Sequence, residues 1–282
     1  LDEIAPFKLQ FTEGIGDNCG LVIGRKSAEV RRIMVSMDLT RRAVLNAKNE
    51  YIDLIITHHP PIWSPLRRIN NDMFLDLMEN GINVISLHTN YDSARLNDIL
   101  AQRLGLVKTE GILQCSTPSG AESLLGRIGI LDEDMTGEDM IQRVKEELGV
   151  EAVRIIGNVK EKIESVAVCQ GSSGGYERDI IELEPDVFIT GEVKYNAAVD
   201  LSNAGCFVIE AGHYETEKLF INDLIEELGY RIPELELMPA ESAVEQVEVT
   251  IAYLEGEAFS FYYAENLEGL RAAGVQLVPV DP

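Results

Sequence analysis

The sequence is poor in basic residues, with 24 lysines and arginines against 48 aspartates and glutamates and a net charge of -24. This imbalance excludes a broad electropositive face for DNA, RNA or an anionic membrane, because such surfaces bind through clusters of lysine and arginine. Long apolar runs are also absent, since no stretch approaches the roughly 20 residues that a membrane-spanning helix needs. We therefore expect neither a nucleic-acid partner nor a membrane location.

Cysteine is scarce as well. The four cysteines are far apart and form no Cys-x-x-Cys pair: Cys19, Cys115, Cys169 and Cys206. This spacing argues against a disulfide scaffold and against a cysteine-based zinc site, and it is typical of reduced, mostly buried thiols. We therefore predict a cytoplasmic protein.

The chain has only four histidines, and each follows a short apolar run. The run Ile52–Ile56 is rich in isoleucine, which predicts a buried strand, and it leads into His58-His59-Pro60-Pro61. Proline does not extend a central strand, so the two histidines mark the point where the strand gives way to a loop. Ligands of open α/β sheets bind at such carboxyl ends of strands.

The order of predicted elements indicates an α/β fold. Strands and helices alternate, which favours mostly parallel sheets covered by helices, and Asp38 or Thr40 would cap the first long helix. The second half repeats the element order of the first, so we expect two similar, interlinked α/β domains. The predicted strands span residues 33–37, 52–56, 83–87, 125–131, 153–156, 163–169, 186–189 and 206–210.

The predicted organisation has three parts, which are residues 1–118, 119–238 and 239–282. A Ser, Pro and Gly-containing loop around residues 116–120 favours the first boundary. The last part has a different pattern, because Val247–Tyr253 and Ala258–Tyr263 alternate apolar and polar residues on either side of a glycine. Such alternation predicts a C-terminal antiparallel β-hairpin.

Four predicted strands are followed by polar side chains, several of which can bind metals. His213 and Glu217 are four residues apart, so on a helix they point from one face. Imidazole and carboxylate ligands suit Zn, Mn, Fe, Co or Ni rather than Ca. Three histidines with two acids suit two divalent ions that share a carboxylate and activate a bridging water. The four groups are His58-His59, His88 with Asp92, Thr190-Gly191-Glu192, and His213 with Glu217.

Each of these groups also has a purely structural explanation. The two adjacent histidines could anchor a loop, His88 could orient a ligand without binding a metal, and the His213–Glu217 pair could lie on a helix surface. The glycine-rich turn Gly171–Gly175 could cradle an anion, or it could be a tight turn that needs glycine conformations. The position of all four histidines at strand ends favours the metal site.

These motifs resemble those of the NIF-three-like proteins, often labelled GTP cyclohydrolase 1 type 2 homologues. The resemblance covers roughly Pro6 to Leu228. It is carried by Asp17-Asn18-Cys19-Gly20-Leu21, Ile56-Thr57-His58-His59-Pro60, His88-Thr89-Asn90-Tyr91-Asp92, Gly126-Arg127-Ile128-Gly129, Gly171-Ser172-Ser173-Gly174, Thr190-Gly191-Glu192-Val193-Lys194-Tyr195 and Gly212-His213-Tyr214-Glu215-Thr216-Glu217.

The resemblance implies two interlinked α/β domains with a dinuclear metal centre in the cleft between them, assembled as a homohexamer. The implied metal ligands agree with the residues reached above and are His58, His59, Asp92, His213 and Glu217. Catalytic roles would fall to His88 and Glu217. The residues expected to line the substrate cleft are Gly171, Ser172, Glu192 and Lys194.

The family label implies hydrolytic opening of the guanine ring of GTP. We therefore predict a metal-dependent hydrolase of the GTP cyclohydrolase type, with a nucleotide such as GTP as its ligand. The alternative is a metal-binding or regulatory scaffold without efficient turnover, which the acidic composition favours because it does not attract GTP. The sequence departs from the family at Asn196, where a histidine often follows the Lys-Tyr pair.

Overall fold

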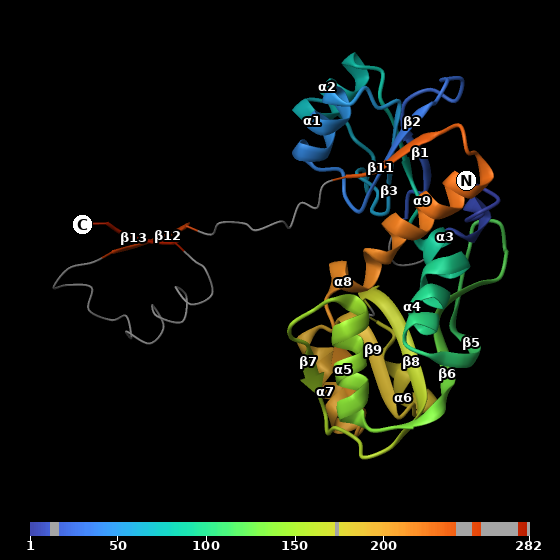
Figure 1. Ribbon diagram of the computed structural model, residues 1–282, viewed down its shortest axis with the longest axis vertical. Coiled ribbons are helices and arrows are strands. Elements are labelled where there is room, and N and C mark those ends of the chain that lie inside the picture. The colour runs from blue at the N-terminus through green and yellow to red at the C-terminus, as the bar shows by residue number, and fades with distance from the viewer. Residues whose placement is uncertain (12–16, 173–174, 241–249, 255–275, 281–282) are drawn as a thin grey trace. The chain divides into compact units, whose positions relative to one another are not determined.

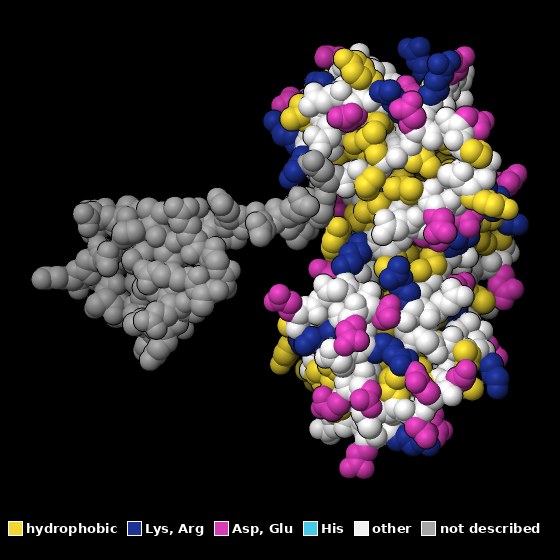
Figure 2. Space-filling model, viewed as in Figure 1, with side chains coloured by type: hydrophobic (Ala, Val, Ile, Leu, Met, Phe, Trp, Pro, Cys, Tyr) yellow, Lys and Arg dark blue, Asp and Glu magenta, His cyan; other side chains and the backbone are white. Residues whose placement is uncertain are grey.

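The computed structural model describes residues 1–11, 17–172, 175–240, 250–254 and 276–280 (Figure 1). The chain divides into two compact units, Leu1–Ala240 and Glu241–Pro282. No helix within these described ranges is long and apolar enough to cross a membrane. On the face of the larger unit shown in Figure 2, acidic and basic side chains are interspersed, so the negative charge is not gathered there in one patch.

The first sheet of the larger unit has five strands in the order β1-β4-β3-β2-β11. Strands β4, β3 and β2 pair in parallel, as predicted. β11, which was not predicted, pairs in parallel with β2, and β1 joins the other edge antiparallel. Parallel neighbours end at the same edge of the sheet, so the loops after them lie close together. The strands are β1 (Gly20–Ile23), β2 (Arg32–Ser36), β3 (Leu54–Thr57), β4 (Asn83–Ser86) and β11 (Glu236–Pro239).

Alternate residues along these strands enter two different hydrophobic clusters, which buries both faces of the sheet. Ile33 and Ile56 belong to the cluster shared with α9, whereas Met34 and Ile55 belong to the cluster shared with α1 and α2. Thr40, rather than Asp38, caps α1 by accepting a hydrogen bond from the backbone of the first turn. The three helices are α1 (Arg41–Asn49), α2 (Asp72–Glu79) and α9 (Leu219–Arg231).

The second sheet has six strands in the order β5-β6-β8-β9-β10-β7, and it is mixed rather than mostly parallel. Strands β8, β9 and β10 are parallel, but β5, β6 and β7 join them through antiparallel pairings. Sequence analysis missed β5, an irregular edge strand in which Lys108 has a positive φ and polar residues interrupt the apolar pattern. The strands are β5 (Leu106–Cys115), β6 (Ser123–Met135), β7 (Arg154–Ile156), β8 (Ile163–Ser172), β9 (Val187–Glu192) and β10 (Val208–Glu210).

Short helices connect and cover these strands. α5 begins with a capping box between Thr136 and Asp139 and ends at Gly149, whose φ of +64° permits the left-handed turn. The segment from α3 to α4 contains a π-helical turn, η2, of the kind often found at functional sites. These elements are η1 (Phe7–Leu9), α3 (Thr89–Tyr91), η2 (Asp92–Leu96), α4 (Asn97–Arg103), α5 (Gly137–Leu148), α6 (Glu177–Leu183), α7 (Tyr195–Asn203) and α8 (His213–Glu217).

The chain passes from the first sheet to the second after α4 and returns through α9 to add β11 beside β2. This return interlinks the two sheets within one compact unit. The loop at residues 116–120, where we placed a domain boundary, connects β5 to β6 inside the second sheet. The later boundary lies close to the division between the two compact units at Ala240.

In the smaller unit, β12 (Thr250–Leu254) pairs in parallel with β13 (Gln276–Val280). The first strand of the predicted hairpin is therefore present. Its predicted partner at residues 258–263 lies outside the described residues, and the pairing that is described is parallel rather than antiparallel.

Candidate metal centre

Three neighbouring strands of the first sheet deliver polar residues to one edge. Asp38 follows β2, His58 and His59 follow β3, and His88 follows β4. The backbone of His58 bonds to the carbonyl of Ser36 at 3.1 Å, which continues the β2–β3 ladder to the end of the strand. The sequence pattern thus correctly placed all three histidines at adjacent strand ends.

The second sheet supplies the opposite wall of the site. After β10 the chain turns at Gly212, whose φ is +103°, and enters α8 with His213. The predicted spacing of His213 and Glu217 on one helix face is confirmed, because Nε2 of the histidine lies 3.1 Å from Oε2 of the glutamate. The side chain of Glu217 is buried, although a glutamate carboxylate normally carries a negative charge in water at neutral pH.

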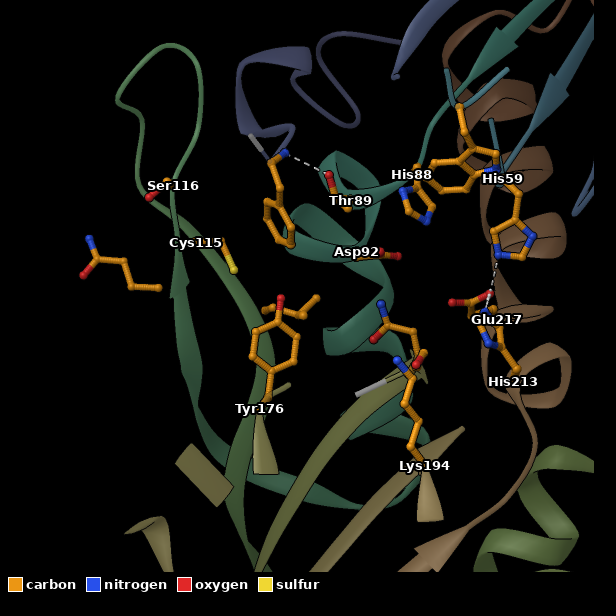
Figure 3. A pocket seen from close by; sticks show the side chains of 16 residues that line it. His59, His88, Thr89, Asp92, Cys115, Ser116, Tyr176, Lys194, His213 and Glu217 are labelled. Carbon is orange, nitrogen blue, oxygen red and sulfur yellow. Dashed lines mark hydrogen bonds and ion pairs between the residues drawn. The ribbon is translucent and has the colours of Figure 1, made fainter. Parts of the chain in front are cut away.

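The two carboxylate oxygens of Glu217 face two separate sets of donors, and Figure 3 shows Glu217 beside His59 and His213 of the first set. Oε2 lies 3.0 Å from His59 Nε2 and 3.1 Å from His213 Nε2. Oε1 lies 3.8 Å from His58 Nε2, which is itself 3.4 Å from Oδ1 of Asp92 at the start of η2. The structure thus brings together all five residues predicted as metal ligands.

Further hydrogen bonds orient the imidazole rings. His58 Nδ1 lies 2.8 Å from the carbonyl oxygen of Leu87 and donates to it, which fixes the ring with Nε2 facing the acids. His59 Nδ1 lies 2.9 Å from Asp38 Oδ1, so that carboxylate fixes the second ring in the same way. Sequence analysis assigned Asp38 only a possible capping role, although its position directly after a predicted strand was a signal for the site.

His88 is held by a residue whose role the sequence did not reveal. Its Nδ1 lies 3.0 Å from Oδ1 of Asp17, whose side chain is fully buried and also accepts hydrogen bonds from Thr89 and Cys19. Burial alone would raise the pKa of Asp17, but these hydrogen bonds, led by that from His88, lower it to about 2. A ring nitrogen of His88 lies within 4.8 Å of ligand nitrogens of His58 and His59.

Several buried atoms of this cluster have no hydrogen-bond partner among the described residues. They include His58 Nε2 and Asp92 Oδ1. Buried polar atoms in folded proteins almost always have a partner, so an orphaned imidazole nitrogen beside an orphaned carboxylate oxygen fits a bound cation. The residues present therefore fit a histidine- and carboxylate-bound metal ion.

The two acids influence each other's protonation. Burial raises the pKa of Asp92, and the nearby charge of Glu217 raises it further. Burial would also raise the pKa of Glu217, but the hydrogen bond from His213 and the nearby imidazole of His58 hold it well below its usual range. Two buried carboxylates this close need positive charge to be ionised together, and a divalent ion supplies it.

Two glycines allow the second sheet to approach α8 closely. Gly171 has a φ of +62°, and a Cβ atom there would lie 2.0 Å from Oε1 of Glu217. A Cβ atom on Gly191 would lie 2.4 Å from the carbonyl oxygen of Gly171 and 2.8 Å from the hydroxyl of Thr216. Gly171, which we predicted to line the substrate cleft, is therefore packed against the shared carboxylate, and the need for glycine comes from this contact.

The centre opens into a cavity of about 710 Å³ (Figure 3). Two of the residues predicted to contact substrate, Ser172 and Lys194, line it. Glu192 is not among the described lining residues, but its Oε1 lies 3.6 Å from Nδ1 of His213, which lines the cavity. Lys194 is the one lysine or arginine among the described residues that line the cavity.

Metal binding is expected to strengthen as the pH rises from about 6 to about 9. Burial alone would lower the pKa of His59, but hydrogen bonds to Asp38 and Glu217 raise it to about 10, and the Glu217 hydrogen bond also raises the pKa of His213. His59 is therefore protonated across this range and must lose a proton to an incoming ion, so affinity should rise about tenfold per pH unit for that proton. Calorimetric titration with Mn²⁺ at several pH values measures this, and a pH-independent affinity would contradict it.

Residues 1–246 match the family model of Duf34/NIF3 (NGG1p interacting factor 3). The chain belongs to this family. A Duf34/NIF3 relative from Clostridium perfringens, named GTP cyclohydrolase 1 type 2 homolog, is 34% identical over 224 residues, which cover 77% of this chain and 84% of the relative. A protein from Helicobacter pylori strain 26695, named GTP cyclohydrolase 1 type 2, is 27% identical over 240 residues, which cover 82% and 91% of the two chains.

Solved structures show the same fold. A Bacillus cereus protein related to NIF3 has a TM-score of 0.77 at 21% identity, covering 86% of this chain and 95% of that one. Reduced HcgD from Methanocaldococcus jannaschii has a TM-score of 0.73 at 26% identity, covering 86% and 94%. The Duf34/NIF3 family and the α/β class predicted from the sequence are both confirmed.

Proposed function

We propose that this chain is a dinuclear metal-dependent hydrolase of the GTP cyclohydrolase type, as the names of its relatives suggest. The observation that supports this most is the placement of the two oxygens of Glu217 against two donor sets. In this proposal His58 and Asp92 would hold one ion, His59 and His213 would hold the other, and Glu217 would contribute to both. The donors suit Zn, Mn, Fe, Co or Ni.

When bound, two such ions supply Lewis acidity and lower the pKa of a water molecule between them. The chain's own residues would then move protons and position the substrate. His88 is the proposed proton carrier, because Asp17 fixes its Nδ1 and its ring lies beside His58 and His59 with centroids 5.3 Å and 5.8 Å apart. Lys194, Ser172 and Glu192 are proposed to contact the substrate at the cavity and its edge.

One observation favours the alternative of a metal-binding or regulatory scaffold. Lys194 is the single basic side chain among the described lining residues, and the whole chain carries a net charge of -24. A triphosphate would therefore depend on the bound metal ions for nearly all of its compensating charge. A scaffold that holds metals without efficient turnover of GTP would not need further basic residues.

Metal content and GTP turnover test the proposal together. We expect about two ions per chain in the wild type and about one in both His58→Ala and His59→Ala, because each change removes a donor from a different set. Glu217→Gln should weaken both ions and abolish turnover, followed as loss of the guanine ultraviolet absorption. Glu215→Gln, on the same helix, is the matched control and should behave as the wild type.

The outcomes separate the two functions. A wild type that binds no Zn²⁺, Mn²⁺ or Fe²⁺ would contradict the metal centre. Full metal content with no GTP turnover would contradict the GTP cyclohydrolase activity and support the scaffold. The homohexamer and the cytoplasmic location stay predictions from the resemblance and the composition, and light scattering of the purified protein measures the former directly.

A further inference from the structure

The wall of the cavity that faces the candidate metal centre is apolar. Figure 3 shows Cys115 and Tyr176 on the side of the cavity opposite His59 and Glu217. Leu125 completes this wall, together with Phe11 from the N-terminal segment. Neither the metal donors nor the proposed proton carrier need an apolar wall, so this surface serves some other purpose.

The apolar wall, formed by Phe11, Cys115, Leu125 and Tyr176, is fixed in place by the core. Phe11 and Leu125 are 3% and 7% exposed and belong to one hydrophobic cluster, against which Cys115 and Tyr176 pack. The backbone N–H of Phe11 donates a hydrogen bond of 3.0 Å to Thr89, which lies in the helix next to the metal donors. The distance between the wall and the centre is thus set before a ligand arrives. Rigid aromatic and aliphatic side chains of this kind bind planar rings well.

One buried side chain that lines the cavity has an acceptor oxygen without a hydrogen-bond partner among the described residues. Gln170 lines the cavity and is only 4% exposed. Its Oε1 has no hydrogen-bond donor among the described residues. A buried acceptor without a donor is costly, so a ligand that brings an N–H group would be favoured here.

We propose that the cavity takes a substrate in which a planar ring carries an amide. The carbonyl oxygen faces the metal centre, the amide N–H donates to Gln170 Oε1, and the ring lies against the apolar wall. This inference rests on the proposed metal centre and adds the substrate class. Simple aryl amides belong to the class, and so does a fused ring with a lactam N–H.

Hydroxamic acids test this arrangement, because they chelate divalent ions and carry an N–H group. Acetohydroxamate and benzohydroxamate differ only in a methyl or phenyl group. Binding to the Co²⁺-loaded protein is followed by its visible absorption. Benzohydroxamate should bind at least about tenfold more tightly than acetohydroxamate, because its ring is buried against the wall. In Tyr176→Ala and in Leu125→Ala the ratio of the two affinities should fall towards one, with acetohydroxamate unchanged. Tyr230→Ala, 87% exposed on α9, is the matched control and should keep the wild-type ratio.

N-methylbenzohydroxamate, which lacks the N–H donor, tests Gln170. It should bind the wild type about fivefold more weakly than benzohydroxamate, and the two should bind Gln170→Met equally. Equal affinities of acetohydroxamate and benzohydroxamate for the wild type would overturn the apolar subsite while leaving the metal centre intact. Failure of all three acids to change the cobalt spectrum would overturn the metal centre itself, and this inference with it. Circular dichroism of each variant confirms the fold, and Tyr176→Ala carries the wall test if Leu125→Ala unfolds.

Discussion

Replacing Gly171 with alanine is expected to empty the metal centre of both ions. The new Cβ atom would lie 2.0 Å from Glu217 Oε1 and 3.3 Å from His213 Nε2, so the shared carboxylate must move. Because Glu217 serves both donor sets, metal content should fall from about two ions per chain to well below one. Metal analysis after gel filtration measures the change, and GTP turnover should disappear with the metal.

Gly149→Ala is the matched control for this prediction. Gly149 has a φ of +64°, nearly the same as the +62° of Gly171, but nothing lies within 4 Å of its added Cβ atom. An alanine in the left-handed conformation costs about 1 kcal/mol of backbone strain in either variant. Any difference in their metal content therefore reports the contact with Glu217. Equal metal content in the two variants would refute the assigned role of Gly171.

Replacing Arg127 with methionine is expected to destabilise the larger unit by about 3 kcal/mol. Its largely buried guanidinium donates to both oxygens of Asp98 at 2.6 Å and 2.8 Å. It also donates to three backbone carbonyl oxygens, of Ser93, Leu124 and Gly126. Methionine fills similar volume but leaves these acceptors without donors. Urea unfolding followed by circular dichroism measures the loss.

This change should also weaken the metal centre, since Ser93 directly follows Asp92 in η2 and Arg127 ties that turn to the second sheet. Arg103→Met is the control, because Arg103 lies 4.0 Å from Glu147 and both side chains are nearly half exposed. An exposed pair of this kind contributes at most about 0.5 kcal/mol. Comparable losses of stability in the two arginine variants would contradict the proposed anchoring.

Much of the site was visible in the sequence because strand ends leave a clear pattern. The apolar run before His58 and His59 predicted a buried strand, and the i, i+4 spacing of His213 and Glu217 predicted a shared helix face. Both patterns depend on neighbouring residues alone. Local periodicity therefore identified the donors, and the motifs identified the family.

The residues that support the donors were not predicted, because their roles exist only after folding. Asp17 and His88 are 71 residues apart in sequence but share a hydrogen bond. Arg127 appeared in the sequence only as part of a motif. Its contacts with Asp98 and Ser93 lie in α4 and η2, which are separated from it in the chain by β5 and a loop. The mixed second sheet escaped prediction for a related reason, since β5 is an irregular edge strand with little apolar periodicity.

The return of the chain to the first sheet determines when the site can form during synthesis. His58 and His59 leave the ribosome about 155 residues before His213 and Glu217, and β11 completes the first sheet only after all of them. A nascent chain that has reached the end of the second sheet still has an unfinished first sheet. The two adjacent histidines would therefore meet Glu217 and His213 only after the second sheet has been synthesised, so the full donor set cannot hold metal before that point.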